Sequence, residues 1–211
     1  MIKALLLIFD TVPTWERVVA ARRRMMFVLF IYLLPTVVLA CAAEGAGLAH
    51  WGKWQPLLHR NRPFSQSETI LYEAVQLGLT LAVVFVCAQV VKVFGETFHN
   101  RQTYAQSFTL VAYALGPLFL LRLFDAFPDM SPWITWGVGI VLAIWVLYQG
   151  LPRVLLPDPS HAFGLYLMSA LMLFLVTGLE RLFTAMYLQG RIDMAHSYLG
   201  IKLSHLFGIQ F

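Results

Sequence analysis

The chain alternates between long apolar stretches and short polar connections, and this pattern decides the fold class. A helix needs about 20 mostly apolar residues to cross a bilayer, because the hydrocarbon core is roughly 30 Å thick and each residue rises about 1.5 Å. The predicted spans are Met25–Ala43, Ile70–Phe94, Ala105–Phe124, Pro132–Tyr148 and Ala162–Leu179, the last with a possible extension to Leu188. Barrel strands would be about 10 residues long and alternating in polarity. The sequence therefore predicts an all-α polytopic membrane bundle of five transmembrane helices.

Composition supports a membrane protein. Hydrophobic residues make up 59% and charged residues 12% of the 211 residues, whereas a soluble domain carries roughly a quarter charged residues. The net charge of +4 fits loops that face anionic headgroups, and the absence of a basic patch with interleaved aromatic residues argues against nucleic acid. We predict one membrane domain, 1–211, divided into an interfacial segment 1–24, a five-helix bundle 25–188 and an amphipathic tail 189–211.

Both ends of the chain have amphipathic patterns and are predicted to lie in the membrane interface. In the first segment, the residues expected to face lipid are Ile2, Leu5, Leu6, Phe9 and Trp15, and those expected to face water are Lys3, Asp10, Glu16 and Arg17. Pro13 is expected to break this helix in two. Arg22, Arg23 and Arg24 abut the first span and resist translocation, which predicts a cytoplasmic N-terminus and, after five spans, an outer C-terminus.

Several local signals predict where helices begin, end or bend. Ser65 and Glu68 have capping-box spacing before the second span, and Ser131-Pro132 is typical of a helix start. The remaining signals are Gly95 and Gly150 as helix stops, Asn100 as a cap of the third helix, and Pro35 and Gly116-Pro117 as bends. The carbonyl groups freed at the bends need partners from neighbouring helices or water.

Ionisable residues lie near the ends of the predicted spans. A charge at the bilayer centre costs about 2.5–3.5 kcal/mol on the insertion scale and usually faces the bundle or a water-filled cavity. One interpretation is structural anchoring, with side chains that snorkel to the interface and with Arg122 paired to Asp125 at helical spacing. The alternative is a transport or ligand site, whose candidate residues are Glu73, Gln76, Gln89, Pro117, Glu180 and Arg181. Gln89 is interpreted as a buried amide that hydrogen-bonds between helices.

The sequence contains no recognisable motif for catalysis or for metal binding. It lacks a Gly-rich phosphate loop, a His-Glu-x-x-His pair, a paired-cysteine zinc pattern and a Gly-x-Ser-x-Gly elbow. Its six histidines are scattered, and Cys41 and Cys87 fall inside predicted spans, where free cysteines are usually small apolar side chains. We predict no catalytic residue, no cofactor and no metal.

The stretch Phe94–Pro117 resembles the signature region of the Yip family of five-span membrane proteins. There, a glycine ends the second span and a polar loop leads into a helix of the form Tyr-x-Gln-x-Phe, followed by Ala-Tyr-x-x-x-Pro. The matching residues are Gly95, Tyr104, Gln106, Phe108, Ala112, Tyr113 and Pro117. Residues 148–152 and 159–163 and the opening Ile8–Val18 are similar to the bacterial branch. The resemblance implies five helices, a cytoplasmic N-terminus and a bacterial inner membrane.

The Asp-Leu-Tyr-Gly-Pro string of the eukaryotic members is absent, so their binding of prenylated Rab-type GTPases is not carried over. The leading hypothesis is a non-enzymatic membrane protein that organises partners or bilayer shape, with membrane lipids, a membrane or peripheral protein, or a second copy as partners. The alternative is a small transporter, channel or lipid-moving protein that uses a polar face of the second span. A third hypothesis, an enzyme acting on lipid headgroups or isoprenoid phosphates, would use the cytoplasmic set His99, Arg101, Arg153, Asp158 and His161.

Overall fold

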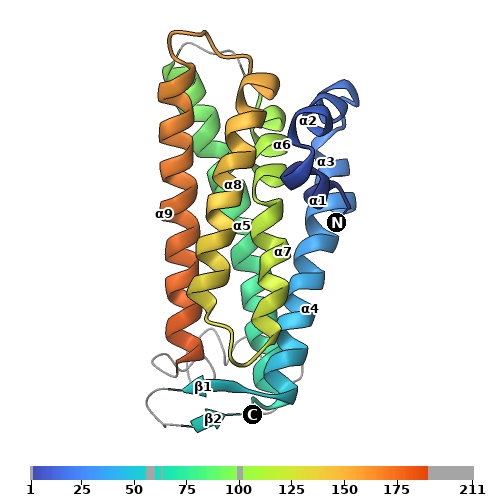
Figure 1. Cartoon of the computed structure of the whole chain (residues 1–211), viewed down its shortest axis with the longest axis vertical. Coiled ribbons are helices and arrows are strands. Elements are labelled where there is room, and N and C mark those ends of the chain that lie inside the picture. The colour runs from blue at the N-terminus through green and yellow to red at the C-terminus, as the bar shows by residue number, and fades with distance from the viewer. Residues whose placement is uncertain (1, 56–59, 63, 99–101, 190–211) are drawn as a thin grey trace.

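Five long helices run along a common axis and form a bundle (Figure 1). The computed structural model describes residues 2–55, 60–62, 64–98 and 102–189. The helices long and apolar enough to cross a membrane are Met25–His50, Gln66–Thr97, Tyr104–Ala126, Pro132–Val154 and Ala162–Leu188. The predicted all-α polytopic bundle is therefore confirmed, including the extension of the last span to Leu188.

The spans are built from continuous and interrupted helices. In chain order, the elements are α1 (Ile2–Phe9), α2 (Thr11–Ala20), α3 (Met25–Val28), the π-helix η1 (Leu29–Leu33), α4 (Leu34–His50), β1 (Lys53–Gln55), β2 (Arg60–Arg62), α5 (Gln66–Thr97), α6 (Tyr104–Ala114), α7 (Gly116–Leu121), the 3-10 helix η2 (Arg122–Ala126), α8 (Pro132–Val154) and α9 (Ala162–Leu188). The two strands pair antiparallel, with Lys53 opposite Arg62, and form a small hairpin at one end of the bundle (Figure 1).

Local sequence chemistry explains most helix ends and both bends. The capping box at Ser65 is confirmed, since the Glu68 N–H donates to Ser65 Oγ at 3.2 Å and the Ser65 N–H donates to Glu68 Oε2 at 2.9 Å. A second capping box, Thr103 with Gln106, starts the third span, whereas Asn100 lies outside the described residues. The π-helix η1 ends two residues before Pro35, and α6 gives way to α7 at Gly116-Pro117. These are the distortions expected where proline removes a backbone donor.

Gly95 and Gly150 do not end their helices, which continue to Thr97 and Val154. Their role is close packing instead. A Cβ on Gly150 would lie 2.4 Å from the indole ring of Trp15, and a Cβ on Gly95 would lie 1.8 Å from Nε2 of Gln102. The prediction failed because a glycine on the packed face of a helix admits a neighbour without stopping the helix.

The N-terminal helices pack against the bundle more closely than predicted. The break falls at Asp10, and Pro13 lies in the first turn of α2, where it is tolerated. Trp15 does not face lipid: it is fully buried, and its Nε1 donates to the Val146 carbonyl at 3.2 Å. Phe9 is exposed as predicted, α1 contacts α7 and α8, and the predicted tail beyond Gln189 lies outside the described residues.

The third span occupies the centre of the bundle. Of its most apolar 18-residue window, 72% is buried, compared with at most 44% for any other span. Its neighbours surround it, because α6 packs on α5 and α8, and α7 with η2 packs on α4 and α8. Polar residues at the end of this span therefore meet protein on all sides rather than lipid.

Two of the three glycines of α8, Gly150 and Gly137, provide a matched test of the packing at Trp15. We expect Gly150→Ala to lower the free energy of unfolding by about 1–3 kcal/mol, because the new methyl group overpacks the indole. Gly137, on the same helix, has open space where a Cβ would lie, so Gly137→Ala should leave stability unchanged or raise it by up to about 1 kcal/mol. Thermal unfolding in detergent would measure both; equal effects of the two substitutions would contradict the packing role.

Candidate functional site

Charged residues from four segments meet inside the half of the bundle nearest the hairpin. They come from α4, α5, η2 and α9, and we call them the charge cluster: Glu44, Glu73, Arg122, Asp125, Glu180 and Arg181. The central third span places Arg122 and Asp125 in the tight turn of η2, within reach of helices on both sides. Glu44 is fully buried, and Asp125 is 2% exposed.

Arg122 joins η2 to α4 and α5. Its Nε donates to Glu44 Oε2 at 2.8 Å, its Nη2 lies 2.8 Å from the same oxygen, and its Nη1 donates to Thr80 Oγ1 at 3.2 Å. The other oxygen of Glu44 accepts a hydrogen bond from the Tyr72 hydroxyl at 2.9 Å. The carboxylate of Glu73 is more distant, at 3.9 Å from Nη2. The predicted pair of Arg122 with Asp125 is wrong, because a buried central helix finds partners on different neighbours.

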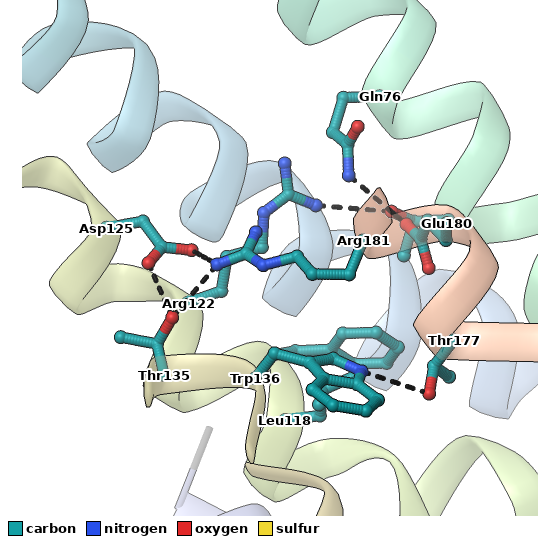
Figure 2. A pocket seen from close by; sticks show the side chains of 11 residues that line it. Gln76, Leu118, Arg122, Asp125, Thr135, Trp136, Thr177, Glu180 and Arg181 are labelled. Atoms are coloured by element: carbon teal, nitrogen blue, oxygen red, sulfur yellow. Dashed lines mark hydrogen bonds and ion pairs between the residues drawn. The ribbon is translucent and has the colours of Figure 1, made fainter. Parts of the chain in front are cut away.

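Asp125 pairs with Arg181 of α9 instead. The two side chains form an ion pair, and Figure 2 shows Arg181 pointing toward Asp125 and Thr135. Arg181 also donates from Nε to the Pro132 carbonyl at 2.8 Å and from Nη2 to Thr135 Oγ1 at 2.9 Å. Thr135 in turn donates to Asp125 Oδ1 at 2.6 Å. This network fastens α9 to η2 and to the first turn of α8.

A polar seam continues between α5 and α9. Oε1 of Glu180 accepts hydrogen bonds from Gln76 Nε2 at 3.2 Å and Thr80 Oγ1 at 2.5 Å. The amide oxygen of Gln76 accepts a hydrogen bond from Thr184 Oγ1 at 3.0 Å. Paired polar groups of this kind hold helices together where lipid offers no alternative partner.

A small cavity of about 30 Å³ lies within this network (Figure 2). Its lining residues are Gln76, Thr80, Leu118, Phe119, Arg122, Asp125, Thr135, Trp136, Thr177, Glu180 and Arg181. Trp136 closes one side and donates from Nε1 to Thr177 Oγ1 at 3.2 Å. Since a single water needs roughly 10–15 Å³ of such space, the cavity holds about two waters or one small ion, and no lipid.

The charges of the cluster do not balance. It contains four carboxyl groups and two guanidinium groups, and both oxygens of Glu73 are buried without a hydrogen bond among the described residues. Lys53 of the hairpin adds a nearby cation: its Nζ donates to the carbonyls of Asp125 and Phe127 at 3.0 and 3.1 Å. Burial lowers the pKa of Lys53, and the neighbouring carboxylate of Asp125 partly opposes this shift.

The structure brings together some of the predicted site residues and separates others. Gln76, Glu180 and Arg181 line the cavity, and Glu73 lies beside it near Arg122. Gln89 is exposed on the outer face of α5, so its interpretation as a buried interhelical amide is wrong. Pro117 is buried at the start of α7 and does not line this cavity.

The snorkelling interpretation of the arginines is also wrong. Arg122 and Arg181 are 8% and 6% exposed and find their partners inside the bundle.

Sequence reasoning missed Glu44 because the predicted first span ends at Ala43, the residue before it. Its helical spacing from the buried residues Val37 and Cys41 was a usable signal, since positions three and four residues apart share a face.

Among the described residues, no group of three or more His, Cys, Asp or Glu side chains is arranged to hold a metal ion.

A family model described as the Yip1 domain matches residues 5–179. The chain belongs to the Yip1 family. No curated protein matches it, and neither does any solved structure. Together with the five apolar helices, this membership makes the chain an integral membrane protein. The matched region, residues 5–179, includes Glu44, Glu73, Arg122 and Asp125 of the charge cluster.

Breaking the Arg122–Glu44 pair tests its energetic weight. We expect Arg122→Gln to lower the free energy of unfolding by about 3–5 kcal/mol, because it leaves Glu44 buried without its counter-charge. Adding Glu44→Gln should recover part of this loss. The surface pair Lys92–Glu96, in which Lys92 is partly buried and Glu96 is exposed, is the control, and Lys92→Gln should cost at most about 1 kcal/mol. Denaturant unfolding in detergent is the measurement. Equal losses of unfolding free energy for Arg122→Gln and Lys92→Gln would contradict the energetic role of the buried pair.

Proposed function

We propose that this chain is a non-enzymatic integral membrane protein that organises bilayer shape and membrane partners. The observation that carries the proposal is the docking of α1 and α2 against the bundle through Trp15. An amphipathic helix fixed to a transmembrane bundle takes up area in one leaflet and follows the orientation of the bundle.

The N-terminal helices enlarge the bundle on one side only. Figure 1 shows α1 and α2 beside the half of the bundle away from the hairpin. Their outward surface is apolar at Phe9, Val12 and Val19 and polar at Glu16 and Arg17, which suits a position at the boundary between headgroups and acyl chains. A wedge in a single leaflet favours curvature with that leaflet on the convex side.

Membrane lipids are the proposed partners, together with a membrane or peripheral protein or a second copy of the chain. We place the protein in a bacterial inner membrane, with the N-terminus in the cytoplasm and the C-terminus outside. The exposed residues Arg22, Arg23 and Arg24 between α2 and α3 support this orientation, because arginines beside a span favour the cytoplasmic side.

Reconstitution into vesicles tests the shape-organising role. We expect vesicle diameter, measured by electron cryomicroscopy, to fall as the protein-to-lipid ratio rises. Trp15→Ala should lose most of this effect, because α2 is no longer held against α8. Trp145→Ala is the matched control, since Trp145 lies on α8 with its side chain exposed. A wild-type protein that leaves the diameter unchanged and yields no partner on crosslinking would overturn the proposal.

The cavity beside the charge cluster favours a second candidate, a small transporter or channel for protons or another small cation. Its volume of about 30 Å³ and its lining by Gln76, Glu180 and Arg181 suit a small charged species and no larger substrate. In proteoliposomes with a trapped pH dye, wild-type protein should then dissipate an imposed pH gradient, and Glu180→Gln should be several-fold slower. Gln89→Leu, on the outer face of α5, is the control; flux equal to that of empty liposomes would contradict this candidate.

A further inference from the structure

A second cavity, of about 250 Å³, lies at the hairpin end of the bundle. Its lining residues are Lys53, Pro128, Asp129, Met130, Ser131, Pro132, Trp133, Ala185, Leu188 and Gln189. It therefore joins the start of α8 to the end of α9, which are the ends of two membrane spans. Hydrocarbon gives way to headgroups at that depth, and the volume is somewhat below the roughly 300–1,000 Å³ of pockets for drug-sized ligands.

The wall of this second cavity contains a buried lysine, Lys53. Lys53 is 6% exposed, and two of its ammonium hydrogens are fixed by the carbonyls of Asp125 and Phe127. No carboxylate in the described part of the chain forms a salt bridge with its Nζ. The carboxylates of Asp125 and Asp129 act on this ammonium group without forming a salt bridge, and a phosphate group would supply a direct ionic partner and a strong acceptor for the third hydrogen.

The same cavity also presents one negative charge. Asp129 lies in the loop before α8, is exposed, and lines the cavity together with Lys53. Ser131 is the N-cap residue of α8, and its side chain makes no capping hydrogen bond. Pro132 has no N–H, and the N–H groups of Ile134 and Thr135 donate to the Ser131 carbonyl, so the N–H of Trp133 is the first-turn donor that an anion can use. The remaining wall is largely apolar and includes Trp133, a residue type that favours the membrane interface.

We propose that this second cavity binds the headgroup of phosphatidylethanolamine. The phosphate contacts Lys53 and the backbone N–H of Trp133, and the primary ammonium contacts Asp129. The acyl chains leave along the apolar side of Trp133 and Ala185 into the bilayer. Phosphatidylglycerol offers no cation for Asp129, and the quaternary ammonium of phosphatidylcholine has no hydrogen to donate, so the proposal predicts both binding and headgroup preference.

Native mass spectrometry of the full chain with an equimolar mixture of the three phospholipids tests the proposal. Wild-type protein should retain phosphatidylethanolamine over phosphatidylcholine by about tenfold, the equivalent of one charge-assisted hydrogen bond. Lys53→Gln should lower retention of all three lipids, because each carries the phosphate. Asp129→Asn should remove only the preference for phosphatidylethanolamine. Lys92→Gln, at a partly buried lysine outside this cavity, should change neither retention nor preference.

Three results would overturn the proposal. These are a wild-type protein with no headgroup preference, an Asp129→Asn variant that keeps the preference, and a Lys92→Gln variant that loses as much lipid as Lys53→Gln. Soluble phosphoethanolamine should displace the lipid poorly, because it lacks the acyl chains; efficient displacement would assign the site to a free phosphate ester instead. Asp129 is exposed, so its substitution remains informative even if Lys53→Gln fails to fold.

Discussion

The fold depends on the pairing of charges inside the membrane-spanning bundle. Arg122 and Arg181 are each held by a carboxylate from another segment, Glu44 and Asp125 respectively. In a low-dielectric interior, removing one member of such a pair costs about 3–5 kcal/mol. The helices that supply them must therefore assemble together, and the position of each helix is fixed by the partner that it brings to η2.

The two ends of the bundle are held by different interactions. Near the hairpin, hydrogen bonds and ion pairs join α4, α5, η2, α8 and α9 beside a small cavity. At the other end, the contacts are aromatic and close: the Trp15 ring meets Tyr113 edge-on with centroids 6.1 Å apart, and Gly150 makes room for the indole. The N-terminal helices are therefore held by contacts that do not involve the charge cluster.

Sequence patterns located the spans well and located their ends poorly. The capping box at Ser65 was readable because its hydrogen bonds join residues three apart in the chain. The end of α4 could not be predicted in this way, because Glu44 has the charge expected at the boundary of a span. Only its contact with Arg122, 78 residues away, shows why the helix continues past it. The same reasoning applies to Gln76 and Glu180, whose polarity was noticed but whose mutual hydrogen bond spans 104 residues.

The sequence by itself determined the solvent, the helical class and the number of spans. Those properties follow from the length and hydropathy of contiguous segments, because each segment must by itself be long and apolar enough to cross the bilayer. Tertiary structure alone decided that Arg122 pairs with Glu44 and not with Asp125, that Trp15 turns inward, and that Gln89 turns outward. Each of these depends on which face of a helix meets a neighbour, and that choice is made by packing between segments far apart in the chain.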